Sequence, residues 1–267
     1  MTPNLVRKNT KPQYRRMLQL AAFCARLSVQ SPKRLAALGR AVAAAALDFE
    51  FDARSPFPEL PRPLGQALGR NWGLTPPHSL LEPGNQNLVG LNYLVSVAKA
   101  LDARTIFEIG TYNGLTALTL ARNIPGATVR TLDLPPGTNP ALTILDGDVS
   151  NIARGFMRAY EGQPEQERII QHLGDSATFE FAPFYGTCQL VYVDGAHSHE
   201  YVEHDTREAL RMVADPGAVI WDDYWRLVPD VAHYLNSHPK QNMFRLQGSR
   251  LLIWLSNKAL TGIVPLG

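Results

Sequence analysis

The chain has few cysteines and no long hydrophobic run. Cys24 and Cys188 are the only cysteines among its 267 residues, and no CxxC pair occurs. This pattern gives no support for a disulfide framework or a zinc site, and it favours a reducing, cytoplasmic location. No stretch reaches the roughly 20 apolar residues that a transmembrane helix needs, so at most a peripheral membrane contact is expected.

Acidic residues are absent from the first 47 positions, which contain nine lysines or arginines. The remainder holds the other 17 of the 26 basic residues and all 24 acidic ones, an asymmetry that the formal net charge of +2 hides. We interpret residues 1–54 as a basic helical extension that binds an anionic membrane surface or a partner, or packs on the acidic body. That acidic body makes nucleic acid an unlikely ligand, because it would repel a phosphate backbone.

Closely spaced prolines after residue 54 predict a linker over residues 55–80, because proline interrupts helices and favours an extended chain. Residues 81–267 are then expected to form the main domain, and the 45% hydrophobic content of the whole chain is enough to bury a sizeable core.

A glycine turn, Glu108-Ile-Gly-Thr-Tyr-Asn-Gly114, follows the apolar run Thr105–Phe107 and precedes a helix-like segment. This is where a parallel strand passes into a helix, the place at which open α/β sheets bind ligands. Gly110 and Gly114 would let the backbone approach a ligand closely. Glu108 would repel a pyrophosphate but would accept hydrogen bonds from an ammonium group, which S-adenosylmethionine carries.

Two later segments extend the nucleoside interpretation. The next predicted strand, Thr128–Asp133, ends in an acid a little over twenty residues after the turn, the separation at which a carboxylate accepts from ribose hydroxyls. Asp175 and Ser176 follow a third strand and can hydrogen-bond an adenine amine; the alternative is that they cap a helix.

Three acids follow two further apolar runs. Leu190–Asp194 and Ala218–Asp222 each end in an aspartate, and Asp223 comes next. Parallel neighbouring strands would bring these carboxylates together, and oxygen ligands select Mg²⁺, or else Mn²⁺ or Ca²⁺. Such an ion would lower the pKa of a substrate hydroxyl. The alternative is that Asp222 and Asp223 form a turn and that Asp194 pairs with a base such as Arg207.

His197 lies three residues after Asp194, where it can take the hydroxyl proton as a general base. The alternatives are a histidine that only orients a ligand or caps the following helix.

The segment Phe107–Thr116 resembles motif I of the class I S-adenosylmethionine-dependent methyltransferases, especially the caffeoyl-CoA and catechol O-methyltransferases. The stretches Val191–Tyr201 and Val219–Tyr224 resemble the bacterial branch that includes the macrocin and mycinamicin sugar O-methyltransferases. The catechol and caffeoyl enzymes have a lysine where this chain has His197, so the base cannot be carried over from them directly.

The resemblance implies an α/β fold: a Rossmann-like, doubly wound, seven-stranded sheet that is mostly parallel with a C-terminal antiparallel hairpin strand. It implies a metal-assisted O-methyltransferase that acts on a sugar-bearing or phenolic small molecule and associates into homo-oligomers. The candidate site residues are His197 for catalysis; Asp194, Asp222 and Asp223 for the metal; and Glu108, Gly110, Tyr112, Asn113, Gly114, Asp133, Asp175 and Ser176 for the cofactor.

Two other functions remain open from the sequence. An NAD-dependent oxidoreductase would also use a ribose-binding acid, although Glu108 and the missing glycine at Tyr112 disfavour it. A non-catalytic scaffold on a methyltransferase fold is the other alternative.

Overall fold

A computed structural model describes residues 52, 54–75, 86–149, 158–237 and 241–263. The chain divides into two compact units, Met1–Arg54 and Ser55–Gly267. The first unit lies almost wholly outside the described residues. The description below therefore concerns the second unit.

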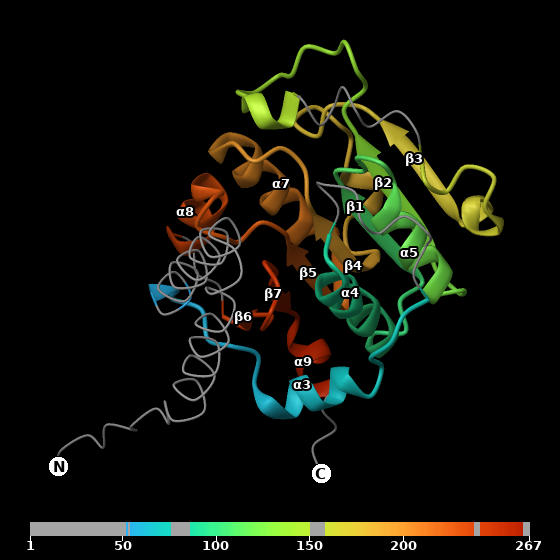
Figure 1. Cartoon of the computed structure of the whole chain (residues 1–267), viewed down its shortest axis with the longest axis vertical. Coiled ribbons are helices and arrows are strands. Elements are labelled where there is room, and N and C mark those ends of the chain that lie inside the picture. Colours follow the sequence, from blue (N-terminus) through green and yellow to red (C-terminus); the bar gives the residue numbers. More distant parts are fainter. Residues whose placement is uncertain (1–51, 53, 76–85, 150–157, 238–240, 264–267) are drawn as a thin grey trace, which may run out of the picture. The chain divides into compact units, whose positions relative to one another are not determined.

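A seven-stranded sheet forms the centre of this unit, in the order β3-β2-β1-β4-β5-β7-β6 (Figure 1). The first five strands in this order run parallel, and β7 runs antiparallel to both of its neighbours. This arrangement confirms the predicted doubly wound sheet with its C-terminal hairpin. The strands are β1 (Thr105–Ile109), β2 (Thr128–Asp133), β3 (Ile169–Leu173), β4 (Cys188–Val193), β5 (Val213–Trp221), β6 (Met243–Arg245) and β7 (Leu252–Leu255).

Helices cover both faces of the sheet, because its central strands bury the side chains of both faces. Even-numbered residues such as Ile106, Leu190 and Ile220 belong to one core, together with side chains of α3, α4, α5 and α9. The odd-numbered Trp221 at the end of β5 points to the other face, where its indole donates a hydrogen bond to Thr206 on α7. The helices are α3 (Arg62–Gly69), α4 (Leu88–Ala100), α5 (Leu115–Asn123), α7 (His199–Met212), α8 (Pro229–Ser237) and α9 (Asn257–Ile263).

Two helices next to the site show why the sequence folds in this way. The Asn87 side chain caps α4 by accepting a hydrogen bond from the Gly90 amide, and the helix then buries an apolar stripe that includes Leu91 and Leu94. On α7, apolar and polar residues alternate with helical periodicity, so Tyr201, Val202 and Ala209 are buried while the opposite face meets solvent.

The predicted linker is part of this unit over its described residues. Arg245 on β6 donates its backbone N–H to the Pro58 carbonyl and accepts from the Leu60 amide, and Phe57 is buried. Helix α3 then begins directly after Pro61, where a fixed proline φ suits a helix start. Residues 55–69 therefore do not form a free connector: they cover the β6 edge of the sheet and supply one helix of the core. Among the described helices, none is long and apolar enough to cross a membrane.

Candidate active site

The carboxyl ends of β1 and β4 meet at the centre of the sheet, where the strand order reverses. The Asp194 amide donates to the Ile109 carbonyl over 2.8 Å, and the Asp222 amide donates to the Val193 carbonyl over 3.0 Å. The glycine turn and the predicted acids are thereby brought to one cavity of about 190 Å³. Its walls come from the loops after β1 to β5, from α7 and from the turn before β7. They include Gly110, Tyr112, Asp133, Asp148, Asp175, Ser176, Asp194, His197, Tyr201, Asp222, Asp223 and Arg250.

Protein atoms pack closely against both glycines of the turn. Gly110 has φ +96°, and a Cβ at this position would lie 1.9 Å from the Asp194 carbonyl oxygen. Gly114 has φ +76° at the start of α5, where a Cβ would lie 2.6 Å from the Tyr160 ring. The room that we expected these glycines to give a ligand is thus taken by the end of β4 and by Tyr160. Gly110 and Tyr112 still line the cavity, whereas Asn113 and Gly114 are not among its lining residues.

Glu108 lies inside the protein, not at the mouth of the turn. Its side chain is on the α4 face of the sheet with 1% exposure, and it accepts a hydrogen bond from Thr131 over 2.5 Å. Thr131 in turn lies 2.6 Å from the Thr111 hydroxyl, so a buried polar network surrounds the carboxyl group. Burial raises the pKa of Glu108 to about 8, although the bond from Thr131 opposes the shift.

The raised pKa of Glu108 predicts that the stability of the fold depends on pH. A carboxyl whose folded pKa is raised binds more protons in the folded than in the unfolded state, so stability is lost as pH rises from about 4.5 to about 8. We expect Glu108→Gln to stabilise the fold by roughly 2–5 kcal/mol at pH 9 and much less at pH 5. Urea denaturation across this pH range measures the difference, with the exposed Glu161→Gln as control. A stability gain that does not grow with pH would contradict the assignment.

Asp133 ends β2 at the cavity wall, as predicted. Its Oδ2 lies 2.7 Å from Nη2 of Arg158, and burial raises the pKa of the carboxyl in spite of this pairing. A ribose approaching Asp133 would therefore share it with Arg158, or displace the guanidinium.

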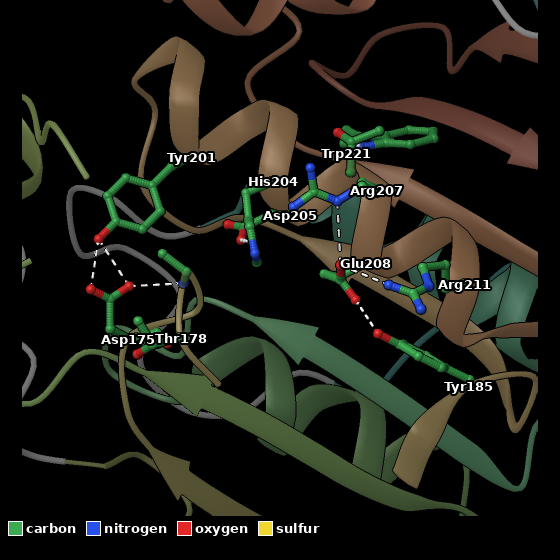
Figure 2. Close-up of polar contacts among 12 residues, drawn as sticks. Asp175, Thr178, Tyr185, Tyr201, His204, Asp205, Arg207, Glu208, Arg211 and Trp221 are labelled. Atoms are coloured by element: carbon green, nitrogen blue, oxygen red, sulfur yellow. Dashed lines mark hydrogen bonds and ion pairs between the residues drawn. The ribbon is translucent and has the colours of Figure 1, made fainter. Parts of the chain in front are cut away.

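Asp175 is engaged by the protein on both carboxylate oxygens. Figure 2 shows the Tyr201 hydroxyl directed at this carboxylate, with oxygen–oxygen distances of 2.9 and 3.0 Å. The Ala177 and Ala141 amides donate to Oδ1 and Oδ2 over 2.9 and 2.6 Å. The side chain thus resembles the capping alternative, although it holds a turn and not a helix. Ser176 lies beside it on the cavity wall.

The three predicted acids do meet, but they have different partners. Asp194, His197 and Asp223 each offer one ligand atom, and these atoms all lie within 4.8 Å of one another. Asp222 instead accepts from the Gln86 amide over 2.6 Å through Oδ2, and from the Asp223 amide over 2.7 Å through Oδ1. The Tyr192 hydroxyl lies 3.0 Å from Asp194 and 3.1 Å from Asp222.

Several carboxylates are buried close together, and their pKa values shift in different directions. Burial, then the charges of Asp222 and Asp223, raises the pKa of Asp194 well above its usual range. Burial and Asp223 also raise the pKa of Asp222. Burial alone would raise the pKa of Asp223, but the His197 imidazole and Arg250 hold it below the usual value. The positive charge near Asp194 is therefore too small to stabilise its ionised carboxylate.

His197 is held between two carboxylates. Its Nδ1 lies 2.6 Å from Oδ1 of Asp148, and its Nε2 lies 2.9 Å from Oδ2 of Asp223. Burial opposes a charge on the imidazole, but the bonds to Asp148 and Asp223 outweigh it and raise the pKa of His197 to about 11. In this arrangement the ring is an imidazolium, and it can act as a base only when one carboxylate is engaged elsewhere.

The sequence interpretation missed three residues of this cluster. Arg250 lies 3.0 Å from Asp223, whereas Arg207, which the alternative interpretation paired with Asp194, lies 3.4 Å from Glu208 (Figure 2). Arg250 could have been found, because it precedes β7, which pairs with the strand that ends at Asp222. Gln86, just before α4, donates its side-chain amide to Asp222 over 2.6 Å. Asp148 lies in a short helical turn, residues 146–149, whose sequence did not mark it as a functional residue.

Comparison with known proteins gives a family match for one part of the chain. Residues 107–224 match the model of a family described as a methyltransferase domain. No curated protein matches the chain. Similar solved structures include a putative O-methyltransferase from Klebsiella pneumoniae, with 16% identity, coverage of 80% of this chain and 97% of that one, and a TM-score of 0.48.

Two further similar structures hold the cofactor or its product. The methyltransferase PaMTH1 of Podospora anserina, bound to S-adenosylhomocysteine, has 14% identity, covers 96% of this chain and 100% of its own, and gives a TM-score of 0.49. The O-methyltransferase TomG of Streptomyces achromogenes, in complex with S-adenosylmethionine, has 17% identity, 79% and 96% coverage, and a TM-score of 0.45.

The matched residues 107–224 carry the glycine turn at the end of β1 and the acidic cluster after β4 and β5, so this part of the chain matches a methyltransferase domain.

Proposed function

We propose that this protein transfers the methyl group of S-adenosylmethionine to a hydroxyl oxygen of a small molecule, with the assistance of a divalent cation. The observation that carries the proposal is the convergence of Asp194, His197 and Asp223 at the cavity, with one ligand atom of each within 4.8 Å of the others. Mg²⁺ suits a site rich in carboxylate oxygens, and Mn²⁺ or Ca²⁺ are the alternatives.

The residues present fit such a cation. Asp194 is a buried carboxyl whose ionised form is disfavoured by its acidic neighbours, and a cation beside it would reverse that effect. Asp194 and Asp223 would supply the oxygen ligands. Asp222 accepts hydrogen bonds from Gln86 and from the Asp223 amide. It would therefore orient the cation ligands without binding the cation itself. A bound cation would lower the pKa of the acceptor hydroxyl.

The residues of the chain then perform the proton transfer. With a cation held by Asp194 and Asp223, the bond from Nε2 of His197 to Asp223 would be weaker. The imidazolium would then release its Nε2 proton to solvent, and this nitrogen would be free to accept the proton of the substrate hydroxyl. The hydroxyl oxygen forms the new bond to the methyl carbon as the carbon–sulfur bond breaks. The sulfonium recovers the electron pair and leaves as the thioether S-adenosylhomocysteine, and the proton stays on His197.

The acceptor class is proposed from two resemblances. The stretches Val191–Tyr201 and Val219–Tyr224 resemble the sugar O-methyltransferases, and Phe107–Thr116 resembles motif I of the catechol and caffeoyl-CoA enzymes. Trp225, which follows the second of these stretches, has the Arg250 guanidinium 5.6 Å from its ring centroid, so an aromatic side chain lies beside the acidic cluster. We propose a sugar-bearing natural product or a phenol as the acceptor.

The test uses S-adenosylmethionine with a deuterated methyl group and a panel of phenols, glycosides, amines and carboxylic acids. We expect label only on hydroxyl oxygens, located by NMR of the product. Chelation should abolish the transfer, and added Mg²⁺ should restore it. Label found only on nitrogen or carboxyl groups, or transfer that is indifferent to chelation, would contradict the proposal.

A further inference from the structure

Asp148 is tied to His197 at two points. Its Oδ2 accepts the backbone N–H of His197 over 2.9 Å, and its Oδ1 lies 2.6 Å from the ring nitrogen Nδ1. The aspartate is 8% exposed, so both contacts are shielded from water. One carboxylate therefore fixes the position of the His197 backbone and the rotation of its ring, and it directs Nε2 toward Asp223.

Asp148 belongs to a segment that runs along the cavity, residues 141–149, which we call the strap. The strap is attached near its beginning by the Ala141 amide to Asp175, and further on by the Thr143 amide to Glu200, over 2.6 and 3.0 Å. The Ser198 hydroxyl donates to the Thr143 carbonyl over 2.7 Å. Ile144 of the strap lines the same cavity as Asp148.

These contacts join the loop after β4 to the strap. The loop holds His197 and Ser198, and both are bonded to the strap; α7, which follows directly, holds it through Glu200. The ring of His197 is held by Asp148 alone on its Nδ1 side among the bonds of the described residues. Glu200→Gln removes a carboxylate next to the strap but keeps an oxygen that can accept from the Thr143 amide, and the described bonds do not join Glu200 to His197, so it is a matched control.

We propose that Asp148 is a positioning residue for the methyl transfer: it keeps a proton on Nδ1 of His197 and leaves Nε2 to receive the proton of the acceptor hydroxyl. The proposal rests on the proposed function of His197 as the base. The hydrogen bond at one ring nitrogen decides which nitrogen is free to react. Asp148 itself does not touch the reacting atoms.

The test compares Asp148→Asn with Glu200→Gln. An asparagine at position 148 keeps the size of the side chain, but it loses the second carboxylate oxygen and the charge. We expect kcat to fall about 10- to 100-fold, with KM for S-adenosylmethionine and the Kd of S-adenosylhomocysteine within about 3-fold of wild type. Glu200→Gln should leave kcat unchanged.

A second measurement does not depend on activity. Imidazole ¹⁵N NMR of the full-length protein, with the His197 signals assigned by their absence in His197→Gln, should show a protonated, slowly exchanging Nδ1 in wild type and in Glu200→Gln. The signal should be lost or shifted in Asp148→Asn.

Several results would overturn the proposal: an unchanged ring signal in Asp148→Asn, a wild-type kcat in that variant, or a loss of cofactor affinity as large as the loss of kcat. If wild type methylates no hydroxyl, the proposed function fails, while the NMR comparison still decides whether Asp148 positions the ring.

Discussion

Gly110→Ala is expected to destroy the folded site. The new Cβ would lie 1.9 Å from the Asp194 carbonyl oxygen, a backbone atom that cannot move without displacing the end of β4. The left-handed φ of +96° adds strain for any L side chain. We expect a loss of at least about 4 kcal/mol, with S-adenosylhomocysteine binding abolished. Urea denaturation and calorimetry with S-adenosylhomocysteine measure the two effects.

Substitutions at two other glycines distinguish the cost of backbone strain from the cost of a steric clash. Gly137 also has a positive φ, +78°, but a Cβ there meets nothing within 4 Å, so Gly137→Ala should cost only about 1–2 kcal/mol. Gly65 lies in α3 in open space, and alanine there should stabilise the protein by roughly 0.5–1 kcal/mol. A Gly110→Ala variant no less stable than Gly137→Ala would show that the contact with β4 is not close.

Asp194→Asn should change stability and activity in opposite directions. Burial and the charges of Asp222 and Asp223 disfavour the ionised carboxyl in the folded state, so its neutral isostere should be at least as stable as wild type at pH 8. Methyl transfer should fall about 10³-fold or more, because the substitution removes a proposed cation ligand. Thermal unfolding and a single-turnover transfer assay measure the two quantities.

The exposed Asp215, which pairs with Lys258 over 3.6 Å, provides the control: Asp215→Asn should leave transfer unchanged. An Asp194→Asn variant that is destabilised by several kcal/mol would assign the carboxylate a structural role. One that transfers methyl at the wild-type rate would remove Asp194 from the mechanism.

Much of the fold could be predicted from the sequence, because its strands are apolar runs that end in turn residues. The predicted strand Thr128–Asp133 has the same bounds in the structure, and the acids after β4 and β5 meet because parallel strands place their carboxyl ends at one edge. The described part of the predicted linker differs: its prolines suggested a free connector, whereas backbone pairing with Arg245 attaches it to the sheet.

The other features of the site depend on tertiary contacts, which a pattern along the sequence does not reveal. The position of Glu108 follows from which face of β1 it occupies, and its neighbour Thr131 comes from another strand. Gly110 looked like a ligand-binding glycine, but the group that approaches it is the backbone of Asp194. Asp148 lies 49 residues from its partner in a segment without regular periodicity, so only the structure brings the two together.

The central claim is that the acidic cluster binds a catalytic cation, and titration of the full-length protein with Mn²⁺ tests it most directly. Electron paramagnetic resonance would follow free Mn²⁺ in the presence of saturating S-adenosylhomocysteine, for wild type and for Asp194→Asn. The account predicts one Mn²⁺ bound per chain in wild type, displaced by excess Mg²⁺ and absent in the variant. Wild-type protein that binds no Mn²⁺, or a variant that binds it equally well, would contradict the account.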